Sequence, residues 1–207
     1  VWQKRITNTT ASSKFVSRDL RSTSDGGCII TGYQEGSTSN PILFKLTSAG
    51  AVTFAKSYDF FSTPYSGGFG VAVISSGYAI TGSENSGAAL VFTTNTSGGV
   101  TWANKYTSGS ISEMHSNSII TDAGGNLVFG GHNLLTTTPA FLVKTNAAGT
   151  VTFGKTYYSR VGMNDIKLST QGYCVVGTSD NYSAAEDIYV INTNTNGDIT
   201  SGCNPTS

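Results

Sequence analysis

Short apolar runs framed by glycine recur along the whole chain, and no segment keeps an apolar period of about 3.6 residues. Four of these runs begin at intervals of about 50 residues, and they read GCIITG from Gly27, GYAITG from Gly77, GNLVFG from Gly125 and GYCVVG from Gly172. Short runs bounded by Gly, Ser and Asn are typical of β-strands joined by turns. The pattern therefore predicts a chain of short strands with essentially no helix.

Three further segments recur beside each run. An apolar strand that leads into a glycine turn follows it, in the forms ILFKLTSAG, LVFTTNTSGG, FLVKTNAAG and IYVINTNTNG. An aromatic strand comes next in three units, with Phe54, Trp102 and Phe153 at the same position of GAVTFAKSY, GGVTWANKY and GTVTFGKTY. Another apolar segment precedes each run, in FVSRDLRST, GVAVIS, NSIITD and NDIKLST. Each unit is therefore predicted to contain four strands.

The central strands of each unit are apolar on both faces, as in CIIT, ILF, LVF and YCVV. A sheet made of such strands packs between other sheets, and four-stranded units of about 45–50 residues are typical of propeller blades. We therefore predict an all-β fold, a four-bladed β-propeller of four-stranded blades that forms one domain over residues 1–207. The predicted blades cover about 10–58, 66–106, 112–157, and 161–200 together with residues 1–6.

The chain begins with VWQKRI, which matches the end of the aromatic strand, because Trp2 takes the position of Phe54 and Lys4 that of Lys56. The fourth unit has no such strand, since its aromatic position is Ser201 in GDITSGCNPTS. An N-terminal strand that completes the last blade would leave no blade unfinished. The alternative is that Val1–Ile6 enters the last blade of a neighbouring molecule, which would give head-to-tail association and a fibre.

The composition narrows the class of protein. The 12 Lys and Arg residues balance the 12 Asp and Glu residues, and the isoelectric point is about 6.9. This charge balance gives no support for binding nucleic acid, and no apolar run is long enough for membrane insertion by a helix. A start at Val1 inside a strand-like segment fits a secreted protein whose signal peptide has been removed, although a truncated chain would look the same.

The three cysteines, Cys28, Cys174 and Cys203, do not have the spacing of a metal site, so neither a metal nor another cofactor is expected. Cys28 and Cys174 are expected to be small buried strand residues, and Cys203 to fix the C-terminal end. One disulfide remains the alternative in an oxidising compartment.

The composite pattern is D-G-G-x-I-I-x-G, then apolar-x-x-K, then G-x-V-T-W/F-x-K-x-Y. It is carried here by Asp25–Gly32, by Leu43-Phe44-Lys45 and by Gly50–Tyr58. This pattern resembles the tandem propeller repeats of secreted Bacteroidetes-type proteins, over nearly the whole chain. The resemblance implies a secreted or cell-surface β-propeller, and it carries no catalytic residues with it. Two departures from the pattern of such proteins are the low number of predicted blades and the lack of a sorting domain within the 207 residues of the sequence.

No catalytic motif is recognisable, because no G-x-S-x-G elbow and no H-x-x-x-H pair is present. The chain is therefore expected not to be an enzyme. The remaining binding candidates lie on one predicted rim. They are the carboxylates Glu35, Glu84 and Asp180 as well as His132, for which a solvated loop position is the simpler interpretation.

The loop Asp59–Phe69 is a further candidate, because its aromatic residues would either stack on sugar rings or cap the core; they include Phe60, Phe61 and Tyr65. Asn8, Asn95 and Asn181 lie in N-x-S/T sequons in predicted turns and are candidates for glycosylation. The lysines that recur at equivalent strand positions are expected to be edge-strand charges; they are Lys4, Lys56 and Lys155, and also Lys45 and Lys144.

These observations predict a non-catalytic secreted or cell-surface propeller that acts as a structural or interaction module, with a self-assembling fibre subunit as one form of it. The expected partners are further copies of the chain and glycans. The alternative is a lectin-like or carbohydrate-active propeller that uses the rim carboxylates and the aromatic loop.

Overall fold

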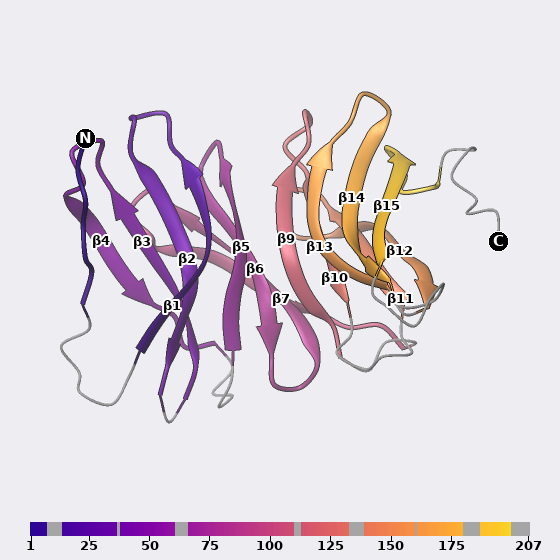
Figure 1. The fold of residues 1–207 in the computed structure, drawn as a ribbon, viewed down its shortest axis with the longest axis horizontal. Coiled ribbons are helices and arrows are strands. Elements are labelled where there is room, and N and C mark those ends of the chain that lie inside the picture. The colour runs from indigo at the N-terminus through magenta and orange to yellow at the C-terminus, as the bar shows by residue number, and fades with distance from the viewer. Residues whose placement is uncertain are drawn as a thin grey trace.

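The computed structural model describes residues 1–7, 14–36, 38–60, 66–109, 113–132, 139–159, 161–179 and 187–199. These residues form four antiparallel sheets and no helix, which confirms the predicted all-β fold (Figure 1). The first sheet contains β1 (Lys14–Ser22), β2 (Cys28–Glu35), β3 (Asn40–Leu46) and β4 (Val52–Ser57). The second contains β5 (Ser66–Ile74), β6 (Gly77–Glu84), β7 (Ala88–Asn95) and β8 (Val100–Tyr106). The third contains β9 (His115–Thr121), β10 (Leu127–His132), β11 (Pro139–Thr145) and β12 (Val151–Ser159), and the fourth β13 (Val161–Leu168), β14 (Gly172–Ser179) and β15 (Asp187–Asn194).

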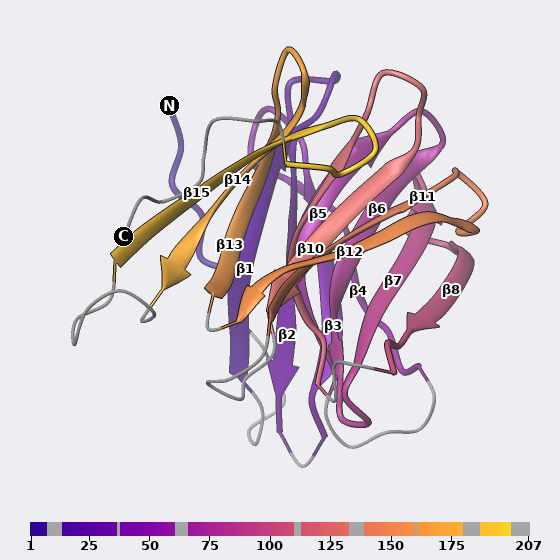
Figure 2. The same cartoon turned by 90° about the vertical axis from the view of Figure 1, so that its right-hand side faces the viewer.

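The strands of each sheet follow one another in chain order, so every sheet is a meander. Figure 1 shows the sheets side by side, with the first and fourth at opposite ends, and Figure 2 looks along this row with the fourth sheet in front. The first strands of successive sheets contact one another, β1 with β5, β5 with β9 and β9 with β13. This is a propeller-like arrangement, in which the first strands are innermost.

Apolar clusters join consecutive sheets, as the two-faced strands predict. Ile29 and Leu43 of the first sheet lie in one cluster with Tyr78, Ile80 and Phe92 of the second. Equivalent clusters lie between the second and third sheets and between the third and fourth. Within the described ranges, extensive contacts link only consecutive sheets, so the array does not close on itself.

The aromatic strand fastens each sheet to the next. Trp102 of β8 packs over the turn at Gly149, and its Nε1 donates a hydrogen bond of 3.1 Å to the carbonyl oxygen of Ala147. The hydroxyl of Tyr106 donates to the carbonyl oxygen of Gly149 at 2.7 Å. The same hydroxyl–carbonyl bond recurs from Tyr58 to Gly98 at 3.0 Å and from Tyr157 to Gly197 at 2.6 Å. The repeated aromatic and tyrosine positions therefore encode contacts between sheets.

Residues 1–7 lie on the outer side of the first sheet, at the end of the array opposite β15 (Figure 1). Trp2 packs over Gly50, as Phe54 packs over Gly98, and Ile6 packs against the cluster that contains Phe44. The predicted pairing of Val1–Ile6 with the last sheet of the same chain is absent among the described residues, because β13–β15 form a three-stranded sheet. The physical reason is distance, since the fanned sheets keep β15 away from residues 1–7.

Two other expectations need correction. Lys45 and Lys144 do not act as edge-strand charges, because they form ion pairs of 2.8 Å with Asp25 and Asp122 while largely buried. Cys28 and Cys174 are free thiols and only half-buried. Cys203 lies outside the described residues.

A β-bulge interrupts the innermost strand of every sheet at the same place. The register shifts leave Arg18, Phe69, Asn117 and Asn164 without a direct partner. Bulges re-aim a side chain and are frequent beside functional sites. The bulged position carries asparagine in the third and fourth sheets, but arginine in the first and phenylalanine in the second.

Candidate functional site

A cleft of about 310 Å³ lies on the face of the array formed by the strand ends, where β2 ends and β5 and β9 begin. Its walls include Arg18 and Tyr33 from the first sheet, Phe69 from the second and His115 from the third. In a propeller this place is the mouth of the central channel, because the innermost strands and the loops between sheets meet there. The cleft is at the small end of the size range of ligand pockets.

Arg18 is the cation of this cleft. Its guanidinium lies 5.3 Å from the ring centre of Tyr33 and 5.4 Å from that of Phe69, and it donates a 3.3 Å hydrogen bond to the Tyr33 hydroxyl. Within the described part of the chain, no carboxylate forms an ion pair with Arg18. The bulge therefore presents a charged, planar group that two aromatic rings hold in place.

Glu84, a predicted rim carboxylate, does lie in the wall of this cleft, but its side chain is fully buried. It accepts hydrogen bonds from Lys105 and from the hydroxyl and backbone N–H of Ser86. Burial alone would raise the pKa of Glu84, but these hydrogen bonds hold that pKa below its ordinary value. Glu84 is thus a charged, internally paired group that shapes the loop before β7.

The two histidines lie directly opposite each other on β9 and β10. Burial lowers the pKa of His115 and that of His132, and each ring is neutral at pH 7 as a result. His132 is not a solvated loop residue, because it is half-buried and its Nδ1 lies 3.0 Å from the Asn117 amide nitrogen. That amide also donates to the Met163 carbonyl oxygen at 2.8 Å, which links the third sheet to the fourth.

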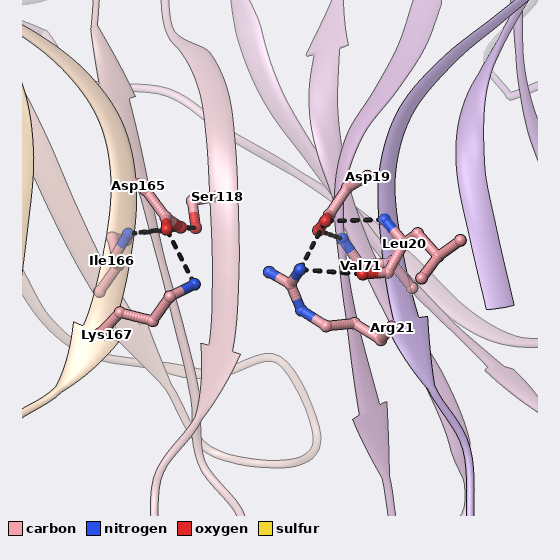
Figure 3. Close-up of polar contacts among 8 residues, drawn as sticks. All are labelled: Asp19, Leu20, Arg21, Val71, Ser118, Asp165, Ile166 and Lys167. Atoms are coloured by element: carbon pink, nitrogen blue, oxygen red, sulfur yellow. Dashed lines mark hydrogen bonds and ion pairs between the residues drawn. The ribbon is translucent and has the colours of Figure 1, made fainter. Parts of the chain in front are cut away.

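Aspartates directly after the bulges join other sheets (Figure 3). Asp19 accepts hydrogen bonds from the backbone N–H of Val71, at 3.0 Å, and from Arg21, at 2.6 Å. Asp165 accepts a hydrogen bond of 2.8 Å from the Ser118 hydroxyl and pairs with Lys167 at 2.8 Å. These carboxylates are engaged within the protein, so they support the inner strands rather than face a ligand.

The other sequence-predicted site residues are not gathered in the cleft. Phe60 packs in the core, with its ring 5.9 Å from that of Tyr58 and 4.7 Å from that of Phe92, so it caps the core. Glu35 is exposed at the end of β2 and does not line the cleft. Phe61, Tyr65 and Asp180 lie outside the described residues.

Asn95 is the one sequon asparagine within the described ranges, and it is the exposed last residue of β7. Its side-chain oxygen accepts hydrogen bonds from the backbone N–H groups of Ser97, at 3.0 Å, and Gly99, at 2.8 Å. Glycosylation at this residue stays a prediction. Asn8 and Asn181 lie outside the described residues.

The outer face of the fourth sheet is apolar and exposed. Val190 lies seven residues before the turn glycine of its unit and is 52% exposed, whereas Leu43, Val91 and Leu142 at the same repeat position are 0% exposed. Ile188 is 82% exposed, and its equivalent Ala89 is fully buried. In the other three units this position is covered by the next sheet.

A search of the described residues finds no group of three His, Cys, Asp or Glu side chains placed to hold a metal ion. It also finds no helix long and apolar enough to span a membrane.

No protein-family model matches the chain, and no curated protein does. Among solved structures it is similar to a gluconolactonase from Xanthomonas campestris, with a TM-score of 0.51 and 12% identity over 79% of this chain and 54% of that one. A putative gluconolactonase gives a TM-score of 0.48 at 13% identity, over 84% and 57% of the two chains. A Bacteroides caccae protein of unknown function gives 0.47 at 14% identity, over 72% and 53%. The chain spans about half the length of the solved structures it matches.

The first of these likenesses supports the propeller-like fold. It also corrects the prediction that the chain is not an enzyme, because an array of this kind occurs in a gluconolactonase. That prediction rested on the absence of a recognisable motif and on repeats whose residues serve packing. Propeller sites are assembled from loops of several sheets, so short sequence motifs do not reveal them.

Proposed function

We propose that this chain is an interaction module that associates head to tail, with the first sheet of one copy packed on the fourth sheet of another. The observation that carries this proposal is the exposure of Val190, at a repeat position that is fully buried in the other three units. Removing an apolar face of this kind from water is the main driving force for association.

The N-terminal segment supplies the matching half of the contact. Residues 1–7 already lie on the first sheet where the aromatic strand of a preceding sheet would lie. In the completed sheets, Leu43 pairs with Lys56 and Leu142 with Lys155. By the same register, Lys4 of one copy would pair with Val190 of the next, and β15 would gain a neighbour on the edge where the described residues form no further strand. The apolar outer face of the fourth sheet and the open edge of β15 would then both be covered by the first sheet and residues 1–7 of another copy.

The secreted or cell-surface location, the fibre form and the resemblance to tandem propeller repeats remain predictions alongside this proposal. The proposal needs only that the first and fourth sheets of two copies meet. A closed ring of two copies and an open filament are both consistent with it, because the rotation between successive copies decides closure.

The test compares the oligomeric state of the chain with that of two variants, by sedimentation velocity over a concentration series. Val190→Asp places a charge on the proposed interface, and Val151→Asp is the matched control, because Val151 is 49% exposed on β12. We expect species larger than 21.6 kDa for the native chain and for Val151→Asp, and a monomer for Val190→Asp. A native chain that stays monomeric, or a Val190→Asp variant that still associates, would overturn the proposal.

The native thiols give a second test. Ile29 and Tyr78 lie in one cluster between the first and second sheets, and Cys174 and Cys28 occupy these two repeat positions. Head-to-tail packing would place Cys174 of one copy across from Cys28 of the next. In a Cys203→Ser background, a bismaleimide with a reach of about 10 Å, the usual distance between packed sheets, should link copies. Cys28→Ala should abolish the link.

If the fourth sheet is instead covered by another part of its own chain, Cys174 will resist labelling by maleimide in a monomer at every concentration. That outcome would also refute association through this face. Protection that grows with concentration is the result we expect.

A further inference from the structure

We propose that the cleft around Arg18 binds an acidic saccharide, with the sugar carboxylate on the Arg18 guanidinium. This inference is independent of head-to-tail association, because residues of the first, second and third sheets line the cleft and no described residue of the fourth sheet does.

The first argument is the unbalanced charge of Arg18. Other cations that point into the array are paired, Arg21 with Asp19 and Lys45 with Asp25, for example. Arg18 contacts aromatic rings and a hydroxyl instead, and no described carboxylate forms an ion pair with it. A guanidinium presents its donors as a planar fork that matches a carboxylate. The fork of Arg18 donates a hydrogen bond to the Tyr33 hydroxyl but pairs with no described carboxylate, and it therefore favours an anionic ligand.

The second argument is the rest of the lining, which suits a sugar better than an inorganic anion. Tyr33 and Phe69 lie edge to face, with ring centres 6.3 Å apart, and give the cleft apolar walls. Glu113, Asn85 and Ser83 add acceptors and donors for hydroxyl groups. A carboxylate such as Glu113 would repel a simple anion but accepts hydrogen bonds from sugar hydroxyls. One cation, polar side chains and aromatic walls together indicate a polyhydroxylated acid.

The third argument is the divergence of the repeats at this place. The bulged residues Arg18, Phe69, Asn117 and Asn164 share one repeat position, but only the last two carry the same residue, asparagine. Two of them, Arg18 and Phe69, meet in the cleft. The departure from asparagine to an arginine and a phenylalanine, in the two units whose bulges line the cleft, points to a local role for these two side chains.

The size of the cleft limits the ligand. About 310 Å³ is at the small end of ligand pockets, so one sugar ring is the expected occupant rather than an extended chain. D-glucuronate is therefore the probe, with D-glucose as the neutral sugar and acetate as the carboxylate without a sugar. Binding is measured by the chemical shifts of the ligand and by calorimetry.

The variant Arg18→Gln removes the guanidinium, and Lys14→Gln is the matched control, because Lys14 is an exposed cation on the same strand outside the cleft. We expect glucuronate to bind the native chain and Lys14→Gln equally. Arg18→Gln should bind at least about tenfold more weakly, as expected for a lost charged hydrogen bond. Arg18→Lys should recover only part of this loss, because lysine lacks the planar fork.

Matching urea midpoints for the native chain and the variants would show that the substitutions leave the fold intact. The proposal fails if glucuronate does not bind, or if it binds no better than glucose, since the carboxylate would then contribute nothing. It also fails if acetate binds as tightly as glucuronate, since the site would then be a simple anion site. Equal binding by Arg18→Gln would exclude Arg18 as the contact.

Discussion

The indole Nε1 of Trp2 donates a hydrogen bond of 2.7 Å to the carbonyl oxygen of Ser48 in the turn between β3 and β4. Trp102 makes the same bond to Ala147 one sheet junction further along the array. The first residues of the chain thus occupy a place that the repeat gives to the aromatic strand of a preceding sheet. Trp2 is 47% exposed there, because no other strand of such a sheet covers it.

Trp2→Ala and Trp102→Ala should destabilise the protein to different degrees. Trp102 lies between two complete sheets, and its loss should lower the free energy of unfolding by about 3 kcal/mol. Loss of the half-exposed Trp2 should cost about 1 kcal/mol, for one hydrogen bond and a smaller buried area. Urea unfolding measures both values, and Lys4→Ala serves as the control beside Trp2. Equal losses for the two tryptophans would mean that residues 1–7 are as firmly packed as β8.

Comparing Gly149→Ala with Gly125→Ala should distinguish the loss of stability caused by backbone strain from the loss caused by a steric clash. Both glycines have positive φ, 84° and 75°, so a side chain costs on the order of 1 kcal/mol at either position. A Cβ at Gly149 would also lie 2.6 Å from the Asn104 amide nitrogen and 3.1 Å from the Trp102 ring, whereas nothing lies within 4 Å at Gly125. We expect Gly149→Ala to lower the thermal midpoint clearly more than Gly125→Ala does. Similar shifts would show that the Trp102 contact yields easily.

Stability should fall in two steps as the pH is lowered. Burial depresses the pKa of His115 and of His132 in the folded protein, with each ring also close to the other. The unfolded chain therefore binds more protons, and this stabilising contribution is lost as the pH falls below about 6.5, the ordinary pKa of histidine. Hydrogen bonds and ion pairs depress the pKa of Asp122 and Asp165 despite their burial, so their contribution is lost only below about pH 4.

Urea unfolding at a series of pH values measures this profile. The double variant His115→Gln, His132→Gln should flatten the step near pH 6 and leave the step below pH 4 unchanged. The charge of Glu113 raises the pKa of His115, so it should make the step near pH 6 smaller without removing it. A native profile that is flat between pH 7 and pH 5 would contradict the burial of the histidine pair.

The sequence was sufficient to predict the sheets because the repeat encodes packing. Glycine turns, two-faced apolar strands and the aromatic strand recur at one interval, and each corresponds to a contact between sheets. The open array was not predictable in this way. A pattern of strands specifies which neighbours pack, but the small rotation between sheets decides whether four of them close a ring, and no single residue encodes that rotation.

The cleft was largely missed for a related reason. Glu84 was identified as a rim carboxylate, but the partner that buries it, Lys105, comes from another strand of the same sheet. Arg18 gave no signal as a residue type. Its signal lies in comparing units, because the bulge position carries asparagine in the third and fourth sheets but arginine in the first. A bulge is invisible to a pattern of alternating residues until the register of the strands is known.

In the described part of the chain, extensive contacts join only consecutive sheets, so the stability of the protein should follow that of a linear repeat array. In such an array stability is the sum of each unit and its junctions, so a unit with two junctions opens less often than a unit with one. Amide hydrogens of β6 and β10 should then exchange most slowly, and those of β14 fastest among the central strands. Each copy added at an end would give a terminal unit a second junction. Assembly would therefore raise the free energy needed to open the terminal units.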